Sequence, residues 1–142
     1  MVSRADLARH PHWRAAFAGE RKDHRYYEIV EDTVRQGFDY RYFVIKDDSG
    51  TVRAIQPCFF LDQDLLQGLG RQAAALVERV RRLWPRFMRM RTLMVGCVAG
   101  EGHLDHAGDS SRGSHARLLA ADVARHARDL KAHLIVLKEF PA

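Results

Sequence analysis

Residues 40–61 read YRYFVIKDDSGTVRAIQPCFFL, and they are the most informative segment about the fold. Residues 40–46 and 51–61 are rich in aromatic and β-branched side chains, which pack well on a pleated surface and favour strands. Between them, Asp47-Asp48-Ser49-Gly50 has the composition of a tight turn. Pro57 has no N–H for a strand ladder, so it predicts an edge or a bulge in the second strand. The stretch therefore predicts an antiparallel hairpin.

A helix is expected before the hairpin. Between Asp23 and Gln36, apolar residues recur every four positions, which is a helical period. Asp23 can cap the start of this helix, and Gly37 can end it. The residues ahead of it mix single apolar side chains with charges, which predicts a short helix or an irregular segment. We therefore expect a lead-in over 1–22 and one domain over 23–142.

An arginine-rich helix is expected after the hairpin. Apolar residues trace one helical face from Leu69 to Trp84, and Pro85 interrupts the pattern. Residues 71–91 contain seven arginines and a single acid, Glu78. A solvated helix face is the simplest interpretation of this run of charge. Contact with phosphate or with a partner is the alternative, because guanidinium groups match such anions well.

The last third of the chain predicts a strand over 92–95, a helix over 114–130 and a strand over 133–138. This order implies a right-handed parallel crossover. Together with the hairpin, it predicts the fold class: α/β (an α+β mixed sheet), with an antiparallel hairpin, a parallel β-α-β unit and flanking helices. The final strand is apolar almost throughout, which predicts burial on both faces. Since the sequence ends at Ala142, we expect the domain to be truncated at its C-terminal end.

Composition narrows the class of protein. The chain has 142 residues, an apolar content of 46% and a formal net charge of +5, which are compatible with a globular domain. No apolar run approaches the roughly 18 residues of a spanning helix, and the N-terminus lacks the apolar core of a signal peptide. We therefore expect a cytoplasmic protein with no membrane among its partners. In that compartment Cys58 and Cys97 are expected to be reduced, partly buried thiols.

One candidate site follows the strand over 92–95. Residues 96–103, GCVAGEGH, form a glycine-containing loop whose backbone amides could approach a ligand. Glu101 and His103 in this loop are candidate acid–base groups. Cys97 and His106 nearby are also metal-ligand types, but their spacing matches no zinc motif, so we expect no metal.

A second candidate site is the start of the following helix. Arg112, Gly113 and Ser114 combine a guanidinium group, a small turn and a helix N-terminus, which is what a pyrophosphate site would use. The simpler interpretation is a helix start that Ser114 caps.

Three segments resemble FemAB-like acyltransferases of the GNAT superfamily, bacterial proteins often labelled as peptidoglycan-biosynthesis enzymes. They are YFVIKDDSGTVRAIQPCFFLDQDLL at 42–66, RMRTLMVGCVAGEGHL at 89–104 and HLIVLKEFPA at 133–142. The likeness extends over residues 13–142 and corresponds to the N-terminal part of such proteins. It rests on the character of these segments, since no invariant catalytic motif lies among them.

The resemblance implies two GNAT-like halves that pack together. A C-terminal GNAT-like domain of the same protein would hold most of the donor, which is acyl-CoA (acetyl-CoA) or an aminoacyl donor. The N-terminal half would shape the cavity for a small-molecule or peptide amine acceptor. The superfamily's pyrophosphate motif, Q/R-x-x-G-x-G/A, would map near 112–116, where a second glycine is missing.

The resemblance also directs attention to particular contacts with substrate. Glu101 and His103 would be the catalytic candidates, Gly102 would contact substrate, and Glu139 would do so from the carboxyl end of the last strand, where α/β sheets bind ligands. Arg112, with its two neighbours, would contact the donor.

Two other functions remain open. The net charge and the arginine-rich helix suggest a small basic nucleic-acid-binding domain, and a half-domain could also serve as a non-catalytic interaction module. A nucleic acid is not favoured as a partner, because the sequence contains no zinc finger, basic zipper or RNP-like aromatic strand.

Overall fold

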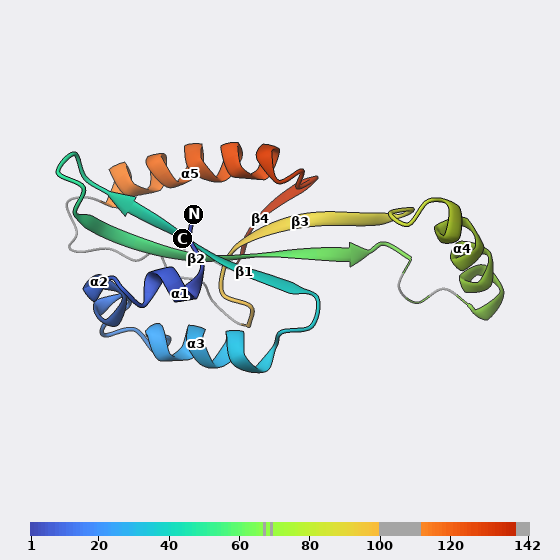
Figure 1. Cartoon of the computed structure of the whole chain (residues 1–142), viewed down its shortest axis with the longest axis horizontal. Helices are drawn as coiled ribbons and strands as arrows, with labels where there is room; N and C mark the ends of the chain where they lie inside the picture. The colour runs from blue at the N-terminus through green and yellow to red at the C-terminus, as the bar shows by residue number, and fades with distance from the viewer. Residues whose placement is uncertain (67, 69, 100–111, 139–142) are drawn as a thin grey trace.

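The structure, a computed structural model, describes residues 1–66, 68, 70–99 and 112–138 (Figure 1). At 71, 72 and 112–115 it describes the backbone alone.

A four-stranded mixed sheet forms the centre of the molecule (Figure 1). Its strands stand in chain order: β1 (Phe38–Lys46), β2 (Val52–Asp64), β3 (Arg89–Gly96) and β4 (Leu134–Lys138). The first three are antiparallel neighbours, whereas β3 and β4 are parallel and α5 (Arg112–Asp129) joins them in the chain. The predicted fold class is therefore confirmed: a mixed α/β sheet with a hairpin and a parallel β-α-β unit.

The turn of the hairpin is fixed by its own side chains. Asp47 Oδ1 accepts hydrogen bonds from the N–H groups of Ser49 at 3.0 Å and Thr51 at 2.9 Å. Gly50 has φ +82°, in the left-handed region that costs glycine little and other residues more. The local chemistry that predicted the hairpin is thus the chemistry that closes it.

Pro57 occupies a position with one strand neighbour. It lies opposite Tyr42 of β1, and the first β2–β3 pair is Cys58 with Val95, one residue further on. The backbone N–H and C=O of Tyr42 bond to Val2, away from β2. The pair is therefore not hydrogen-bonded, and the missing N–H of Pro57 breaks no bond to β1. The predicted edge position holds locally, although β2 is an inner strand from Cys58 onward.

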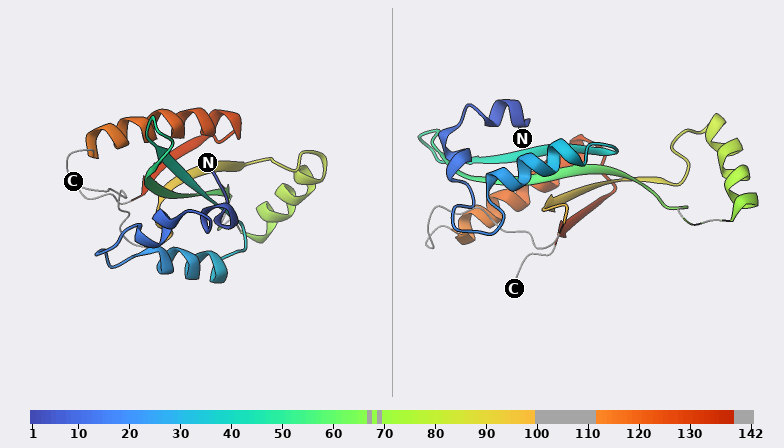
Figure 2. Two further views of the ribbon diagram at one scale, coloured as in Figure 1. Left: turned by 60° about the vertical axis from the view of Figure 1, so that its left-hand side comes forward. Right: turned by 90° about the horizontal axis from the view of Figure 1, so that it is seen from below.

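Helices cover both faces of the sheet (Figures 1 and 2). α5 lies on one face, and α1 (Arg4–Leu7), α2 (Pro11–Ala15) and α3 (His24–Thr33) lie on the other. Side chains alternate between two apolar clusters. The cluster beneath α5 contains Phe43, Ile45, Ala54, Cys58, Phe60, Leu93, Val95, Leu119, Val123 and Ala127. The opposite cluster contains Leu7, Trp13, Ala16, Phe17, Tyr27, Tyr42, Ile55 and Cys97. Residues 1–22 therefore supply part of the core.

The helix boundaries agree with some of the capping signals in the sequence and differ from others. Asp23 Oδ1 accepts the N–H of Arg25 at 3.0 Å, so the predicted N-cap of α3 is confirmed. α3 ends at Thr33, before the predicted end at Gln36. α5 begins at Arg112, so the prediction that Ser114 caps this helix is wrong. Arginine continues a helix readily, and the helix extends past the serine toward its N-terminus.

The described residues do not bury the last strand on both faces, so the cover that its apolar sequence predicts is not supplied by this part of the chain. β4 is the edge of the sheet, and Leu134, Ile135 and Leu137 keep 42%, 40% and 65% of their surfaces exposed. An apolar cavity of about 490 Å³ lies between β4 and α5. The apolar run correctly indicated a strand. Composition does not tell which residues pack on the two faces of that strand.

α4 (Arg71–Leu83) lies apart from the other helices, at the far ends of β2 and β3 (Figures 1 and 2). We call α4 and its following turn, residues 71–88, the arm. Arg81 holds the arm to the sheet, because its two terminal nitrogens each lie 2.7 Å from an oxygen of Asp64. Its Nε donates to the carbonyl oxygen of Phe87 at 3.1 Å, within the arm. Among the described residues, no helix has the length and apolar character needed to cross a membrane.

Candidate functional site

A polar hollow of about 380 Å³ opens beside the outer edge of β1. α1, the end of α3 and the first half of β1 form its walls, so three separate segments meet there. Its lining combines guanidinium groups, carboxylates and aromatic rings from Ser3, Arg4, Glu31, Arg35, Phe38, Asp39, Tyr40 and Arg41. Such a mixture suits a ligand that carries charges of both signs.

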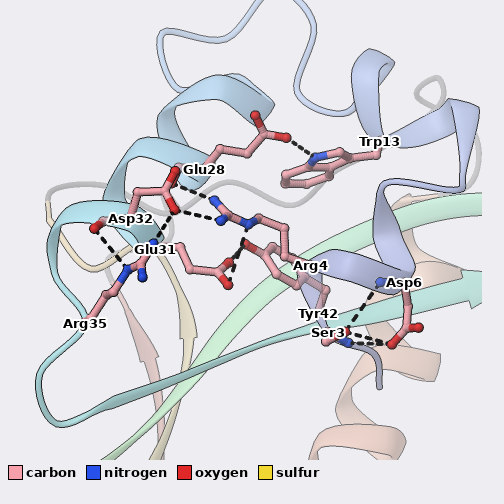
Figure 3. A network of polar contacts seen from close by, with 9 residues as sticks. All are labelled: Ser3, Arg4, Asp6, Trp13, Glu28, Glu31, Asp32, Arg35 and Tyr42. Atoms are coloured by element: carbon pink, nitrogen blue, oxygen red, sulfur yellow. Dashed lines mark hydrogen bonds and ion pairs between the residues drawn. The ribbon is translucent and has the colours of Figure 1, made fainter.

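Arg4 joins α1 to α3 at the base of this hollow (Figure 3). Its Nη2 lies 2.6 Å from Asp32 Oδ1, and its Nη1 donates to the carbonyl oxygen of Glu28 at 3.1 Å. The same Asp32 oxygen accepts from Arg35 Nη2 at 2.9 Å. The hydrogen bond from Arg4, and then that from Arg35, lower the pKa of Asp32 below its ordinary value. Asp32 is therefore an ionised residue already engaged by two arginines.

Glu31 is a carboxylate of the hollow itself. Tyr42 Oη donates to its Oε2 at 2.7 Å, and Arg4 Nε lies 3.8 Å from its Oε1 (Figure 3). Burial, reinforced by the bond to Glu31, raises the pKa of Tyr42, so the phenol stays protonated as the donor. Trp13 Nε1 donates to Glu28 Oε1 at 2.8 Å, which ties α2 to α3 one turn earlier. Glu31 is thus held at a fixed position on a braced helix.

Two aromatic rings line the same hollow. Phe38 and Tyr40, two residues apart on β1, stack with their centroids 5.8 Å apart and their planes 15° apart. Tyr40 Oη donates to the carbonyl oxygen of Val34 at 2.8 Å, and burial raises the pKa of Tyr40 to about 12. Tyr40 also lines a small enclosed cavity with Gly96 and Val98. This ring therefore connects the hollow to the carboxyl end of β3.

The carboxyl end of β3 is held by a compact set of polar contacts. The Cys97 thiol lies 2.7 Å from the carbonyl oxygen of Ala99 and 3.3 Å from Tyr26 Oη. Tyr26 Oη and Lys22 Nζ donate to the same carbonyl at 3.2 and 2.8 Å. Burial, and then the contact with Cys97, raise the pKa of Tyr26. Cys97 and Cys58 are both free and buried, which confirms the thiols expected from the sequence.

The predicted site residues lie mainly outside the described part of the chain. Glu101, Gly102 and His103 fall between β3 and α5, and Glu139 follows β4; none of the four is described. Arg112, Gly113 and Ser114 form the first turn of α5, but the structure does not describe their side chains. Their proposed roles therefore remain predictions.

The residues of the hollow were not singled out from the sequence. Glu28, Glu31 and Asp32 stand at helical spacing, so an acidic stripe on the expected helix was readable. Arg4 carried a weaker signal: Ser3 and Asp6 form a capping box around the start of α1. No sequence signal indicated that Arg4 would meet Asp32.

Among the residues that the structure describes, no three His, Cys, Asp or Glu side chains are grouped so that they could hold a metal ion. No protein-family model, curated protein or solved structure matches the chain.

Proposed function

We propose that this chain is the N-terminal portion of an acyltransferase that transfers an acyl group, acetyl or aminoacyl, to an amine, and that this half shapes the acceptor cavity. One observation carries the proposal: an antiparallel β1–β2–β3 sheet continues into a parallel β3–α5–β4 unit with helices on both faces. This arrangement agrees with what the FemAB-like resemblance implies for a GNAT-like half.

The polar hollow is the proposed acceptor cavity. Glu31 offers its carboxylate to a protonated amine. Arg35 pairs with Asp32 at 2.9 Å and Arg41 with Asp39 at 3.0 Å, and their remaining guanidinium N–H groups are offered to a carboxylate. The acceptor that fits is a small molecule or peptide bearing both groups. The stacked Phe38 supplies apolar surface beside them.

The transfer requires little covalent help from the protein. The deprotonated amine nitrogen attacks the thioester carbonyl of acyl-CoA, a C–N bond forms and the C–S bond breaks. The leaving thiolate takes up a proton, and the proton of the attacking amine passes to a base. We assign this base to Glu101 or His103. For an aminoacyl ester donor the leaving group is an alcohol and the remaining steps are the same.

The donor is proposed to bind mainly to the C-terminal GNAT-like domain. The exposed apolar edge of β4 and the 490 Å³ cavity beside it support a covering partner of this kind. From this half, the first turn of α5, residues 112–114, would contribute backbone N–H groups to the donor's pyrophosphate, because such groups lack partners within the helix.

The test uses the protein that combines this chain with the C-terminal domain. Acetyl-CoA is offered with amino acids and dipeptides, and N-acylated product is detected by mass spectrometry. We expect acyl transfer, a loss of at least about 10²-fold in kcat/KM when Glu101 and His103 are both changed to alanine, and a rise in KM for the acceptor in Glu31→Gln. Glu78→Gln on the arm is the matched control and leaves both constants unchanged.

Each part of the proposal fails separately. An unchanged kcat/KM in the Glu101→Ala, His103→Ala double variant refutes the assignment of the base. An unchanged acceptor KM in Glu31→Gln removes the hollow from the acceptor site. If no thioester or aminoacyl ester is turned over with any amine, the acyltransferase function itself is wrong.

A further inference from the structure

The arm exposes an apolar stripe. Leu76, Leu83 and Trp84 keep 64%, 92% and 63% of their surfaces exposed, although side chains of these types are usually covered. At 100° per residue, Leu76, Val80 and Leu83 fall on one side of α4. Three exposed large apolar side chains within nine residues of chain form a patch, and such patches mark surfaces that bind something.

Arginines border this stripe. Arg79 lies beside Leu76 and Leu83, three and four residues from them along α4, and Arg82 lies further round the same flank. Arg86 follows in the turn, and all three arginines are exposed. Arg81 is engaged with Asp64, whereas the one acid of the helix, Glu78, lies 3.6 Å from Arg81. The free face of the arm is therefore apolar along its centre and positively charged along its side. Its partner must be apolar and anionic at once.

We propose that the arm docks on the surface of an anionic lipid bilayer. α4 lies in the plane of the surface, with Leu76, Leu83 and Trp84 at the boundary between headgroups and acyl chains. Arg79, Arg82 and Arg86 contact the phosphates and acidic headgroups. A short amphipathic helix that has leucines on one side, a tryptophan directly after its last residue and arginines along its flank is the type of helix that binds in this way.

Other occupants match only half of this surface. A nucleic acid would use the arginines but leave the leucine side chains in water. A second copy of the chain would cover the leucines but bring like-charged arginines toward one another. An anionic bilayer satisfies both features. This form of docking differs from spanning, since α4 has 13 residues and is roughly 20 Å long, below the 30 Å of a bilayer core.

The position of the arm leaves it accessible to a flat surface. α4 stands clear of α1, α2, α3 and α5 at one end of the molecule (Figures 1 and 2). The bidentate contact from Arg81, whose side chain is only 9% exposed, sets the orientation of the helix relative to β2 and β3. The expectation of no membrane partner rested on the lengths of apolar runs, which do not report an exposed helical stripe.

The test measures binding of the whole chain to lipid vesicles. Vesicles of phosphatidylcholine are compared with vesicles that contain phosphatidylglycerol as well, by co-sedimentation and by tryptophan fluorescence. We expect binding to the anionic vesicles, with a shift of emission to shorter wavelength that Trp84→Phe abolishes; Trp13 is buried and does not respond. Binding falls as salt concentration rises, because part of the attraction is electrostatic.

Two sets of variants separate the charges from the stripe. Changing Arg79, Arg82 and Arg86 to glutamine lowers the vesicle affinity about 10²-fold, since each arginine near an anionic surface contributes about a factor of five. The matched control changes Arg117, Arg125 and Arg128 on α5, which are also exposed. This variant loses the same charge, and its vesicle affinity falls far less. Leu76→Ser with Leu83→Ser lowers the affinity at least tenfold, whereas Leu118→Ser on α5 does not.

Each contrary outcome overturns the proposal. Equal binding to both types of vesicle, or to neither, excludes the anionic surface. Affinity for random duplex DNA that survives the leucine changes assigns the arm to nucleic acid. A dimer that dissociates when the leucines are changed, without vesicle binding, assigns it to a second copy. Circular dichroism and urea midpoints unchanged from the parent chain show that the variants are folded.

Discussion

α5 and α4 have similar sequence patterns, but the apolar side of α5 is buried and that of α4 is exposed. Both have a regular apolar side and several arginines. On α5 the apolar side is buried: Leu119, Val123 and Ala127 keep 6%, 4% and 4% of their surfaces exposed. On α4, Leu76 and Leu83 remain largely in water.

The difference between the two helices comes from what each connects. α5 joins two neighbouring parallel strands, so it returns across the sheet and its apolar side meets β1, β2 and β3. α4 joins two antiparallel strands at their far ends, where the sheet has narrowed to β2 and β3. The helical period identifies the apolar side, but the connection decides whether the sheet can cover it.

The largest expected effect is a loss of stability when a leucine is shortened on α5 and not on α4. Leu119→Ala removes buried side-chain volume beneath α5 and should lower the free energy of unfolding by about 3 kcal/mol. Leu76→Ala makes the same change on α4 and should cost less than about 0.5 kcal/mol, since that side chain is mostly exposed. Urea unfolding followed by circular dichroism measures both. Equal losses of unfolding free energy in the two variants would mean that the arm packs onto the rest of the domain in solution.

A smaller effect is expected when a polar contact is removed between α3 and the sheet, and a smaller one still when a polar contact of the arm is removed. Tyr42→Phe removes the hydroxyl that donates to Glu31 and should lower the free energy of unfolding by about 1 kcal/mol. Arg81→Gln removes the contact with Asp64 and should leave the urea midpoint nearly unchanged. It should instead speed hydrogen exchange of the α4 amides, because local opening of the arm does not require global unfolding. A global loss in Arg81→Gln that exceeds the loss in Tyr42→Phe would contradict this division.

The smallest effect is a pH dependence confined to the arm. The hydrogen bonds from Arg81 lower the pKa of Asp64 from 3.8 to about 2. Because the folded-state pKa is depressed, the contact stabilises the arm fully above about pH 4 and is lost as the pH falls toward 2. Quenching of Trp84 by acrylamide should rise over that interval. Asp64→Asn should show no such rise, and a rise retained in Asp64→Asn would assign the effect to other carboxyl groups.

Local features of the fold were predictable because each depends on residues close together in the chain. Asp47 and Gly50 form their turn within five residues, and Asp23 caps α3 through the amide two positions on. The polar hollow was not predictable in this way. Arg4 and Asp32 are far apart in the sequence, and only the packing of α1 beside α3 brings them to 2.6 Å.

The order of the main helices and strands, the mixed sheet and the apolar side of each long helix follow from the amino-acid sequence, because backbone preference and hydrophobic period act over a few residues. Which apolar surfaces are covered depends on the packing of distant segments. This packing left β4 at the edge of the sheet and the α4 stripe in water, and it gathered Arg4, Glu31 and Arg35 around one hollow. Burial is a property of the space around a side chain, and segments distant in the chain fill that space.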